Sequence, residues 1–148
     1  MVPFKENPAF VVWSVTVTLL VLKCLATSLL QAFVRVRNRR YVRPDDARFF
    51  GRDAEPAEEE HILVQRGAGV WRNDLENIPF FFFLSLAMVL AGADVEWTLA
   101  CCGIFVLARV SHSAFYFVPR QPFRNIAYQL GMLTMLVVAG KTLWLLLS

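Results

Sequence analysis

Four long apolar runs set the strongest limit on what this chain of 148 residues can fold into. The first runs from Ala9 to Phe33 and is interrupted only by the charge of Lys23. The others cover residues 78–93, 95–118 and 123–147. About 20 apolar residues in a helix cross a bilayer, and the second run reaches that length if its helix begins near residue 62. A secretory signal is the alternative for the first run, but the apolar part of such a signal is only ~7–15 residues long and follows a positive flank.

These runs predict an all-α membrane protein, a single domain over residues 1–148 in which four transmembrane helices form an up-down bundle. We expect the helices at about residues 9–36, 62–92, 95–118 and 124–147, with one long loop at about 37–61. Pro79 falls inside the second helix, where membrane helices tolerate proline. Two prolines within residues 119–122 predict a turn before the last helix.

The composition agrees with burial in lipid. Hydrophobic residues make up 57% of the chain and charged residues 18%, whereas soluble globular chains have about 45–50% and about 25%. A soluble domain of this size has too little interior to hide the surplus apolar surface. The three cysteines, Cys24, Cys101 and Cys102, all lie in apolar runs, which favours buried thiols over a disulfide framework.

The charges are concentrated in the expected long loop and the segment after it. Between Arg35 and Glu60, seven arginines are balanced by seven acids, which makes a poor surface for nucleic acid. By the positive-inside rule, the arginines place this loop and the turn around Arg120 in the cytoplasm, with both termini on the other side. We therefore expect an integral, multi-pass protein of the endoplasmic reticulum in a eukaryote or of the inner membrane in a bacterium.

Polar residues at membrane depth identify the candidate site, because charges there are costly and usually functional. Arg109, His112 and Tyr116 share one face of the third helix at spacings of i, i+3 and i+7. We expect them to meet polar residues at the same level on the other helices, namely Arg35, Arg72, Asn73, Glu76, Arg124, Asn125 and Tyr128. Each set taken alone has a simpler explanation. Arg109 can snorkel to the interface, Arg72 and Glu76 can form an ion pair along one helix, and Tyr128 can belong to an interfacial aromatic belt.

The combined set suits an anionic, peptide-like ligand. Arginine forks bind carboxylates, Glu76 matches an ammonium group, and asparagines match amides. The sequence contains no His, Cys and Asp cluster with the spacing of metal ligands, so we expect no metal. It also contains no glycine-rich phosphate loop and no serine nucleophile elbow.

Four segments resemble motifs of the membrane-associated proteins in eicosanoid and glutathione metabolism, the MAPEG family. The polar stretch Arg72–Phe80 resembles the R-N-D-x-E-x-I signature, and Arg109–Tyr116 resembles R-x-x-H-x-x-x-Y. Pro44–Ala47 is similar to the P-E-D-A of the first loop, and Gln121–Arg124 to the P-x-R that opens the last helix. The resemblance is closest to the branch of microsomal glutathione transferases and prostaglandin E synthases.

The resemblance implies a homotrimer that binds glutathione between protomers at the cytoplasmic side. It assigns the glutathione site to Arg72, Asn73, Glu76, His112, Tyr116, Arg124 and Tyr128, with Arg35 from a neighbour. We add Arg109, because it shares a helix face with His112 and Tyr116. We expect Arg124, Asn125 and Tyr128 to form the catalytic group, with Arg124 stabilising the glutathione thiolate. Asn125 stands where part of the family has a serine.

The expected activity is that of a membrane-bound glutathione transferase or peroxidase, in which the thiolate attacks a lipophilic electrophile or a lipid hydroperoxide. One alternative is a glutathione-dependent isomerase of the prostaglandin E synthase type, which releases glutathione unchanged. The other is a non-catalytic lipid-binding scaffold, as found in one branch of the family. The expected partners are glutathione, a lipophilic second substrate, the bilayer and two further copies of the chain.

Overall fold

A computed structural model describes residues 4–52 and 54–148, and the regular structure in these ranges is entirely helical. Its elements are η1 (Phe4–Glu6), α1 (Pro8–Asn38), α2 (Pro44–Phe50), α3 (Ile62–Leu90), α4 (Val95–Phe117) and α5 (Gln121–Leu147). Of these, α1, α3, α4 and α5 are long and apolar enough to cross a membrane. The prediction of an all-α chain with four such helices is therefore confirmed.

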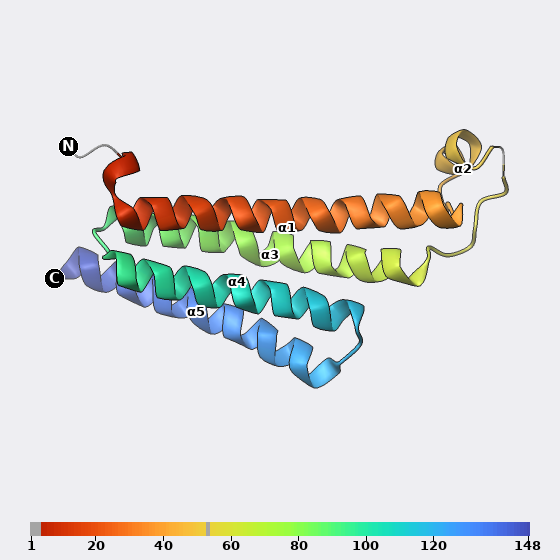
Figure 1. The fold of residues 1–148 in the computed structure, drawn as a ribbon. Coiled ribbons are helices and arrows are strands. Elements are labelled where there is room, and N and C mark those ends of the chain that lie inside the picture. The colour runs from red at the N-terminus through yellow and green to blue at the C-terminus, as the bar shows by residue number, and fades with distance from the viewer. Residues whose placement is uncertain (1–3, 53) are drawn as a thin grey trace.

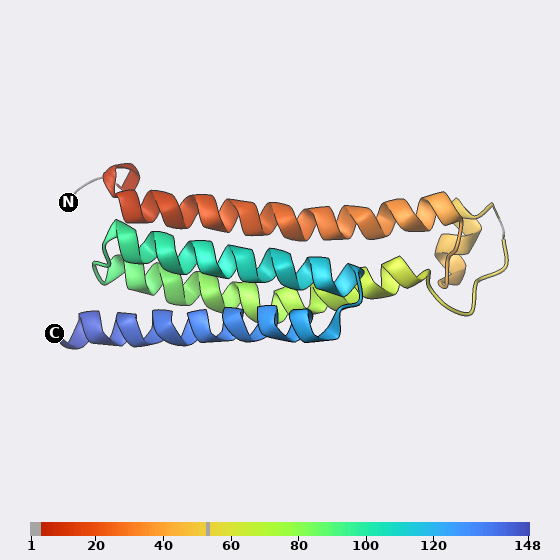
Figure 2. The same cartoon turned by 60° about the horizontal axis from the view of Figure 1, so that its bottom comes forward.

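The four long helices form a bundle in which successive members run in opposite directions (Figures 1 and 2). Helices α3 and α4 contact each other, and each also packs against both α1 and α5. The short helix η1 and the C-terminal end of α5 lie at the same end of the bundle as the short α3–α4 connection. At the other end, α1 and α3 extend past α4 and α5 and carry the segment that contains α2.

Specific contacts fix how far the helices are shifted along one another. Near one end of α3, the Arg66 guanidinium donates to the Phe117 carbonyl oxygen at 2.8 Å. Deeper in, the Phe81 and Phe105 rings stack with centroids 3.8 Å apart. Since a helix rises ~1.5 Å per residue, this antiparallel register brings the middle of α3 beside the last third of α4.

The interior is apolar toward the end that holds the termini and polar toward the α4–α5 turn. Phe81, Phe105 and Met88 are completely buried in the apolar part, and Cys101 and Cys102 pack with them as free thiols. The outer faces carry exposed large apolar side chains along all four long helices, as a lipid environment requires.

Two local expectations need correction. The segment expected as a loop at about 37–61 contains the helix α2, although its residue 53 lies outside the described residues. Pro44 in the first turn, followed by Asp45 and Asp46, is a typical helix start. The sequence analysis used this stretch only as a family motif and did not predict a helix from it. In addition, α5 begins at Gln121 instead of at residue 124, because Pro122 sits in the first turn, where no amide hydrogen is needed.

Candidate functional site

Arg109 forms the centre of the polar part of the bundle. Its side chain is completely buried, and its Nη1 donates to Asn73 Oδ1 at 2.8 Å. The guanidinium carbon lies 5.5 Å from the Phe105 ring centroid and 5.8 Å from that of Tyr128. Among the described residues, Arg109 Nε and Nη2 have no hydrogen-bond partner. A cation is thus held in the interior by one amide oxygen and two aromatic rings.

A glycine on the neighbouring helix makes the space for this guanidinium. A Cβ atom added at Gly131 of α5 would lie 2.6 Å from Arg109 Nη2 and 3.1 Å from its Cζ. A separation of 2.6 Å is essentially never seen for a real Cβ atom, so a larger residue would displace the end of the arginine side chain. The absence of a side chain at Gly131 is therefore part of the site.

The aromatic side of the site begins one turn further along α4. The His112 ring is buried, with its centroid 5.8 Å from that of Tyr116 and 6.3 Å from that of Tyr128. Arg124, which also donates to Gln121, holds its guanidinium carbon 4.7 Å from the Tyr116 ring centroid. Tyr116 in turn lies so close to Gly69 of α3 that a Cβ there would collide with its hydroxyl group.

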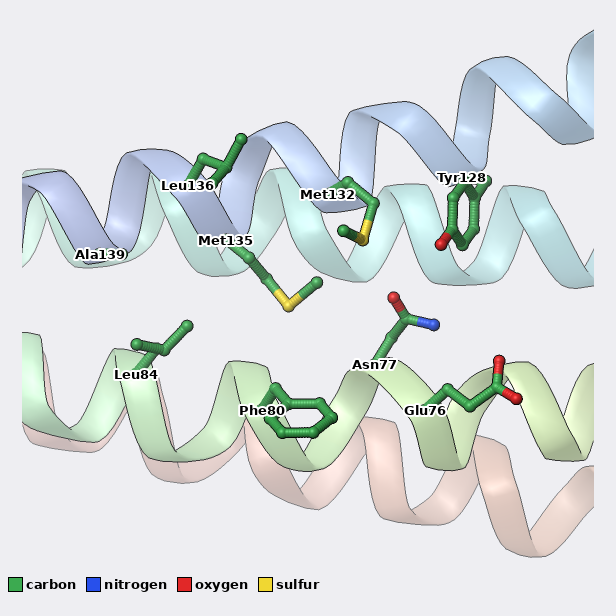
Figure 3. A pocket seen from close by; sticks show the side chains of 9 residues that line it. All are labelled: Glu76, Asn77, Phe80, Leu84, Tyr128, Met132, Met135, Leu136 and Ala139. Atoms are coloured by element: carbon green, nitrogen blue, oxygen red, sulfur yellow. The ribbon is translucent and has the colours of Figure 1, made fainter.

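A groove of about 390 Å³ opens between α3 and α5 beside this cluster (Figure 3). Its lining residues are Glu76, Asn77, Phe80 and Leu84 from α3 and Tyr128, Met132, Met135, Leu136 and Ala139 from α5. Figure 3 shows Glu76, Asn77 and Tyr128 together at one end, with methionine and leucine side chains toward the other. The groove is thus polar at one end and apolar along the rest of its length.

The structure brings together most of the residues that the sequence singled out. A continuous set of contacts joins Asn73, Arg109, Tyr128, His112, Tyr116 and Arg124. Glu76 is exposed and lies on the same groove as Tyr128.

Three predicted residues lie apart from this set within the protomer. Arg35 forms an ion pair with Glu60 at 2.9 Å and lines a separate groove against α2. Arg72 and Asn125 are exposed on the surfaces of α3 and α5. The role of these three residues in binding or catalysis stays a prediction.

Sequence reasoning missed an ion pair next to the site. Lys23 of α1 is bonded to Asp74 of α3, whose side chain is completely buried. Lys23 is the one charge in a long apolar run, and Asp74 directly follows Asn73, so a search for opposite charges at membrane depth would have found both. Gly69 and Gly131, which leave space for Tyr116 and Arg109, carry no feature in the sequence that indicates this role. Among the described residues, no group of three or more His, Cys, Asp or Glu side chains could hold a metal ion.

Comparisons with known proteins agree on one family. The family model described as "MAPEG family" matches residues 13–144. Microsomal glutathione S-transferase 1 of Mus musculus is 30% identical over 141 residues, which cover 93% of this chain and 91% of the relative. Prostaglandin E synthase of Equus caballus is 31% identical over 145 residues, covering 97% and 92%. The human prostaglandin E synthase is 31% identical over 140 residues, covering 93% and 88%.

Proposed function

Because the chain belongs to the MAPEG family and is an integral multi-pass membrane protein, we propose that it is a glutathione transferase and peroxidase acting on lipophilic substrates. The observation that carries the proposal is the position of the cluster around Arg109 and Tyr128, at the polar end of a groove that is otherwise apolar. A water-soluble thiol and a lipid-soluble electrophile can meet only at such a boundary.

The groups available at the cluster match the chemistry of glutathione, which has two carboxylates, one ammonium group and two amides. Arg72, exposed on α3, and Arg35 from a neighbouring protomer provide guanidinium partners for the carboxylates. Glu76, exposed at the polar end of the groove, provides the partner for the ammonium group. His112 and Tyr116 lie in the same aromatic cluster as Tyr128, and the His112 ring nitrogens and the Tyr116 hydroxyl can each donate or accept a hydrogen bond.

We assign the activation of the thiol to Arg124. A free thiol has a pKa of ~8.5, so only a small fraction is thiolate at neutral pH. A guanidinium close to the sulfur favours the anion and lowers the pKa of the bound thiol. Arg124 is half-buried, and arginine does not act as a base in proteins, so we expect it to act through its electric field and to take no proton. Tyr128 supplies a hydroxyl to the same space, and Asn125 completes the proposed catalytic group.

Both reactions proceed by attack of the thiolate sulfur. With an aryl halide, a carbon–sulfur bond forms and the carbon–halogen bond breaks, so the halide leaves with the electron pair. With a lipid hydroperoxide, the sulfur attacks the outer peroxide oxygen, the O–O bond breaks, and the alkoxide takes up a proton to leave as an alcohol. The resulting sulfenic acid condenses with a second glutathione to give the disulfide and water.

The apolar length of the groove suits the second substrate. Phe80, Leu84, Met132 and Met135 line it, and methionine side chains adapt to ligands of different shape. Leu136 is largely exposed on the outer surface, so the groove opens to the side of the helix bundle. A lipophilic molecule can therefore reach the thiol without leaving the membrane.

We further propose a homotrimer in which a neighbouring protomer completes the glutathione site. Exposed polar residues such as Arg72 and Glu76 in the middle of a membrane-spanning helix favour a surface covered by another copy. Arg35 would come from that copy, and its ion pair with Glu60 would open or rearrange when a carboxylate of glutathione binds.

An isomerase of the prostaglandin E synthase type is the second candidate, because a relative of that name covers 97% of the chain at 31% identity. The two candidates differ in whether glutathione is consumed. Purified protein is therefore incubated with glutathione and either a chromogenic aryl halide, a lipid hydroperoxide or a prostaglandin endoperoxide. We expect loss of glutathione with the first two substrates. Endoperoxide turnover at constant glutathione, without either of the other activities, would replace the transferase proposal with the isomerase.

The role of Arg124 has its own test, in which the ultraviolet absorbance of thiolate is followed as the pH is raised with glutathione bound. Loss of a cation ~4 Å from the sulfur removes ~4 kcal/mol of attraction at an effective dielectric of ~20. Even a quarter of that corresponds to most of one pKa unit. Arg124→Ala should therefore need a more alkaline solution to form thiolate, whereas Arg120→Ala, in the exposed turn nearby, should not. Overlapping curves for the wild type and Arg124→Ala would transfer the role to Arg109 or Tyr128.

A further inference from the structure

A cation without an acidic partner lies between two indole rings at the end of the bundle that holds η1. Lys141 of α5 has its Nζ 5.0 Å from the ring centroid of Trp97 and 4.2 Å from that of Trp144. Trp97 lies in the first turn of α4, and both indoles are exposed on the outer surface. Lys141 forms no ion pair with any residue that the structure describes. Its ammonium group therefore remains available to donate to an anion.

An acid without a basic partner lies beside the same indole. Glu96 directly precedes Trp97, is exposed and forms no ion pair within residues 4–52 and 54–148. A groove of about 260 Å³ is lined by Glu96, Trp97 and Ala100. This end of the α4–α5 pair thus presents a cation and an anion near one aromatic ring, and the two charges do not neutralise each other.

The same faces of α4 and α5 form an apolar groove near the α4–α5 turn. Phe115 lies 18 residues after Trp97 on α4, and 18 residues make five complete turns of an α-helix. Phe123 lies 18 residues before Lys141 on α5. The groove, of about 190 Å³, is lined by Leu107, Ala108, Ser111 and Phe115 of α4 and by Phe123, Ile126, Ala127 and Leu130 of α5. Lys141 and this groove therefore lie along one surface, which we call the α4–α5 seam.

The length of the α4–α5 seam matches one leaflet of a bilayer. Leu107 lies 10 residues after Trp97, and Leu130 lies 11 residues before Lys141. At ~1.5 Å per residue, the near edge of the groove is about 15–17 Å further along the bundle. Each leaflet contributes about half of a hydrocarbon core of ~30 Å. The exposed side chains on the intervening surface are apolar and include Ile104 and Val137.

We propose that the α4–α5 seam binds one zwitterionic phospholipid from the leaflet at the η1 end of the bundle. The phosphate accepts from Lys141 Nζ, and the headgroup cation pairs with Glu96 and contacts the face of Trp97. The acyl chains lie along the seam and end at the groove. The site is separate from the α3–α5 groove and goes beyond the proposed function. A headgroup satisfies both charges at once, whereas an apolar protein surface would cover them and leave them unpaired.

Native mass spectrometry of delipidated protein in detergent tests the proposal with dioleoylphosphatidylcholine as the probe. The wild type should retain one lipid per chain. Lys141→Met should bind it about tenfold more weakly, because the phosphate loses a charged donor, and Lys141→Arg should restore binding. Lys5→Met, which removes an exposed lysine from η1 at the same end, is the matched control and should bind like the wild type. Equal retention by the wild type and Lys141→Met would overturn the proposal.

Two analogues of the lipid test the headgroup and the chains separately. Dioleoylphosphatidylglycerol has the same chains and phosphate but no cation, so the wild type should bind it several-fold more weakly than the choline lipid. Glu96→Gln should remove this preference, and a preference that survives the substitution would refute the role of Glu96. Glycerophosphocholine has the headgroup without acyl chains and should not bind at the same concentrations. If it bound as tightly as the whole lipid, the site would be one for a soluble phosphate ester and not for a lipid.

The same spectra distinguish a lipid from a second copy of the chain on the seam. If another copy covered it, Lys141→Met would change the number of chains in the complex and leave the lipid count unaltered, which would contradict the proposal. Melting curves without added lipid serve as the folding control. Lys141→Met loses only its contacts with the two indoles and should melt within about 4 °C of the wild type. Should it unfold instead, Lys141→Arg and Glu96→Gln still decide the outcome.

Discussion

The ion pair between Lys23 and Asp74 should be one of the strongest single contributions to the stability of the bundle. It joins α1 to α3, and the side chains of Lys23 and Asp74 are 14% and 0% exposed. Replacing Lys23 by Met keeps an unbranched side chain of similar length and removes the charge. Asp74 is then left as a carboxylate in the interior, and its Oδ1 already has no hydrogen-bond partner among the described residues.

The expected loss follows from this burial. Removing one partner of a buried ion pair costs about 3–5 kcal/mol, because the remaining charge is uncompensated. For a chain of this size, a loss of 1 kcal/mol lowers the melting temperature by roughly 2–4 °C. Lys23→Met should therefore melt about 6–20 °C below the wild type. Replacing both partners by apolar residues, as in Lys23→Met with Asp74→Leu, should restore most of that loss, since no charge remains inside.

Melting curves of the purified protein in one detergent test this expectation, with Lys141→Met as the matched control. Lys141 also lies in a spanning helix, but it stacks on Trp97 and Trp144 with its Nζ 5.0 Å and 4.2 Å from their ring centroids. Its removal leaves no buried acid and should cost only about 0.5–1 kcal/mol. A Lys23→Met variant that melts with the control, or a double variant no more stable than the single one, would show that the pair does not hold α1 to α3.

Two further predictions concern the packing around Arg109 and the orientation in the membrane. Gly131→Ala should lower the melting temperature and weaken glutathione binding because its Cβ displaces Arg109, whereas Gly140→Ala, with no atom within 4 Å of the added Cβ, should be neutral or slightly stabilising in the same assays. A cysteine introduced at Glu55, after the native cysteines have been replaced, should react with an impermeant thiol reagent from the cytoplasmic side, as the arginines of that loop predict. Reaction from the opposite side alone would reverse the proposed orientation.

The helices and the composition of the polar cluster could be predicted because both depend on local patterns. Apolar runs long enough to span a bilayer leave few alternatives to helices. The spacing of Arg109, His112 and Tyr116 also defines one helix face whatever that face contacts. The short helix Pro44–Phe50 had a readable start signal as well, but a charged segment was expected to be a loop.

The partners across helices could not be predicted, because they depend on the register between helices. A shift of one helix by a single turn, ~5.4 Å, would separate Asn73 from Arg109 and Lys23 from Asp74. That register is set by interdigitating side chains, such as the Phe81 and Phe105 rings, and by small residues that allow close approach. Gly131 shows this clearly, since its role depends entirely on which side chain of α4 lies opposite.

The same register leaves the interior with an unbalanced charge. Lys23 and Asp74 neutralise each other, whereas Arg109 is bonded to the neutral amide of Asn73 and to no carboxylate among the described residues. An unpaired cation away from water is costly, and an anion that binds nearby reduces that cost. We therefore expect a ligand whose negative charge comes close to Arg109 and Tyr128 to stabilise the protein. Under the proposed function, glutathione at the polar end of the groove would bring its negative charge beside the Tyr128 ring that contacts the buried guanidinium, while Arg124 remains the group that stabilises the thiolate.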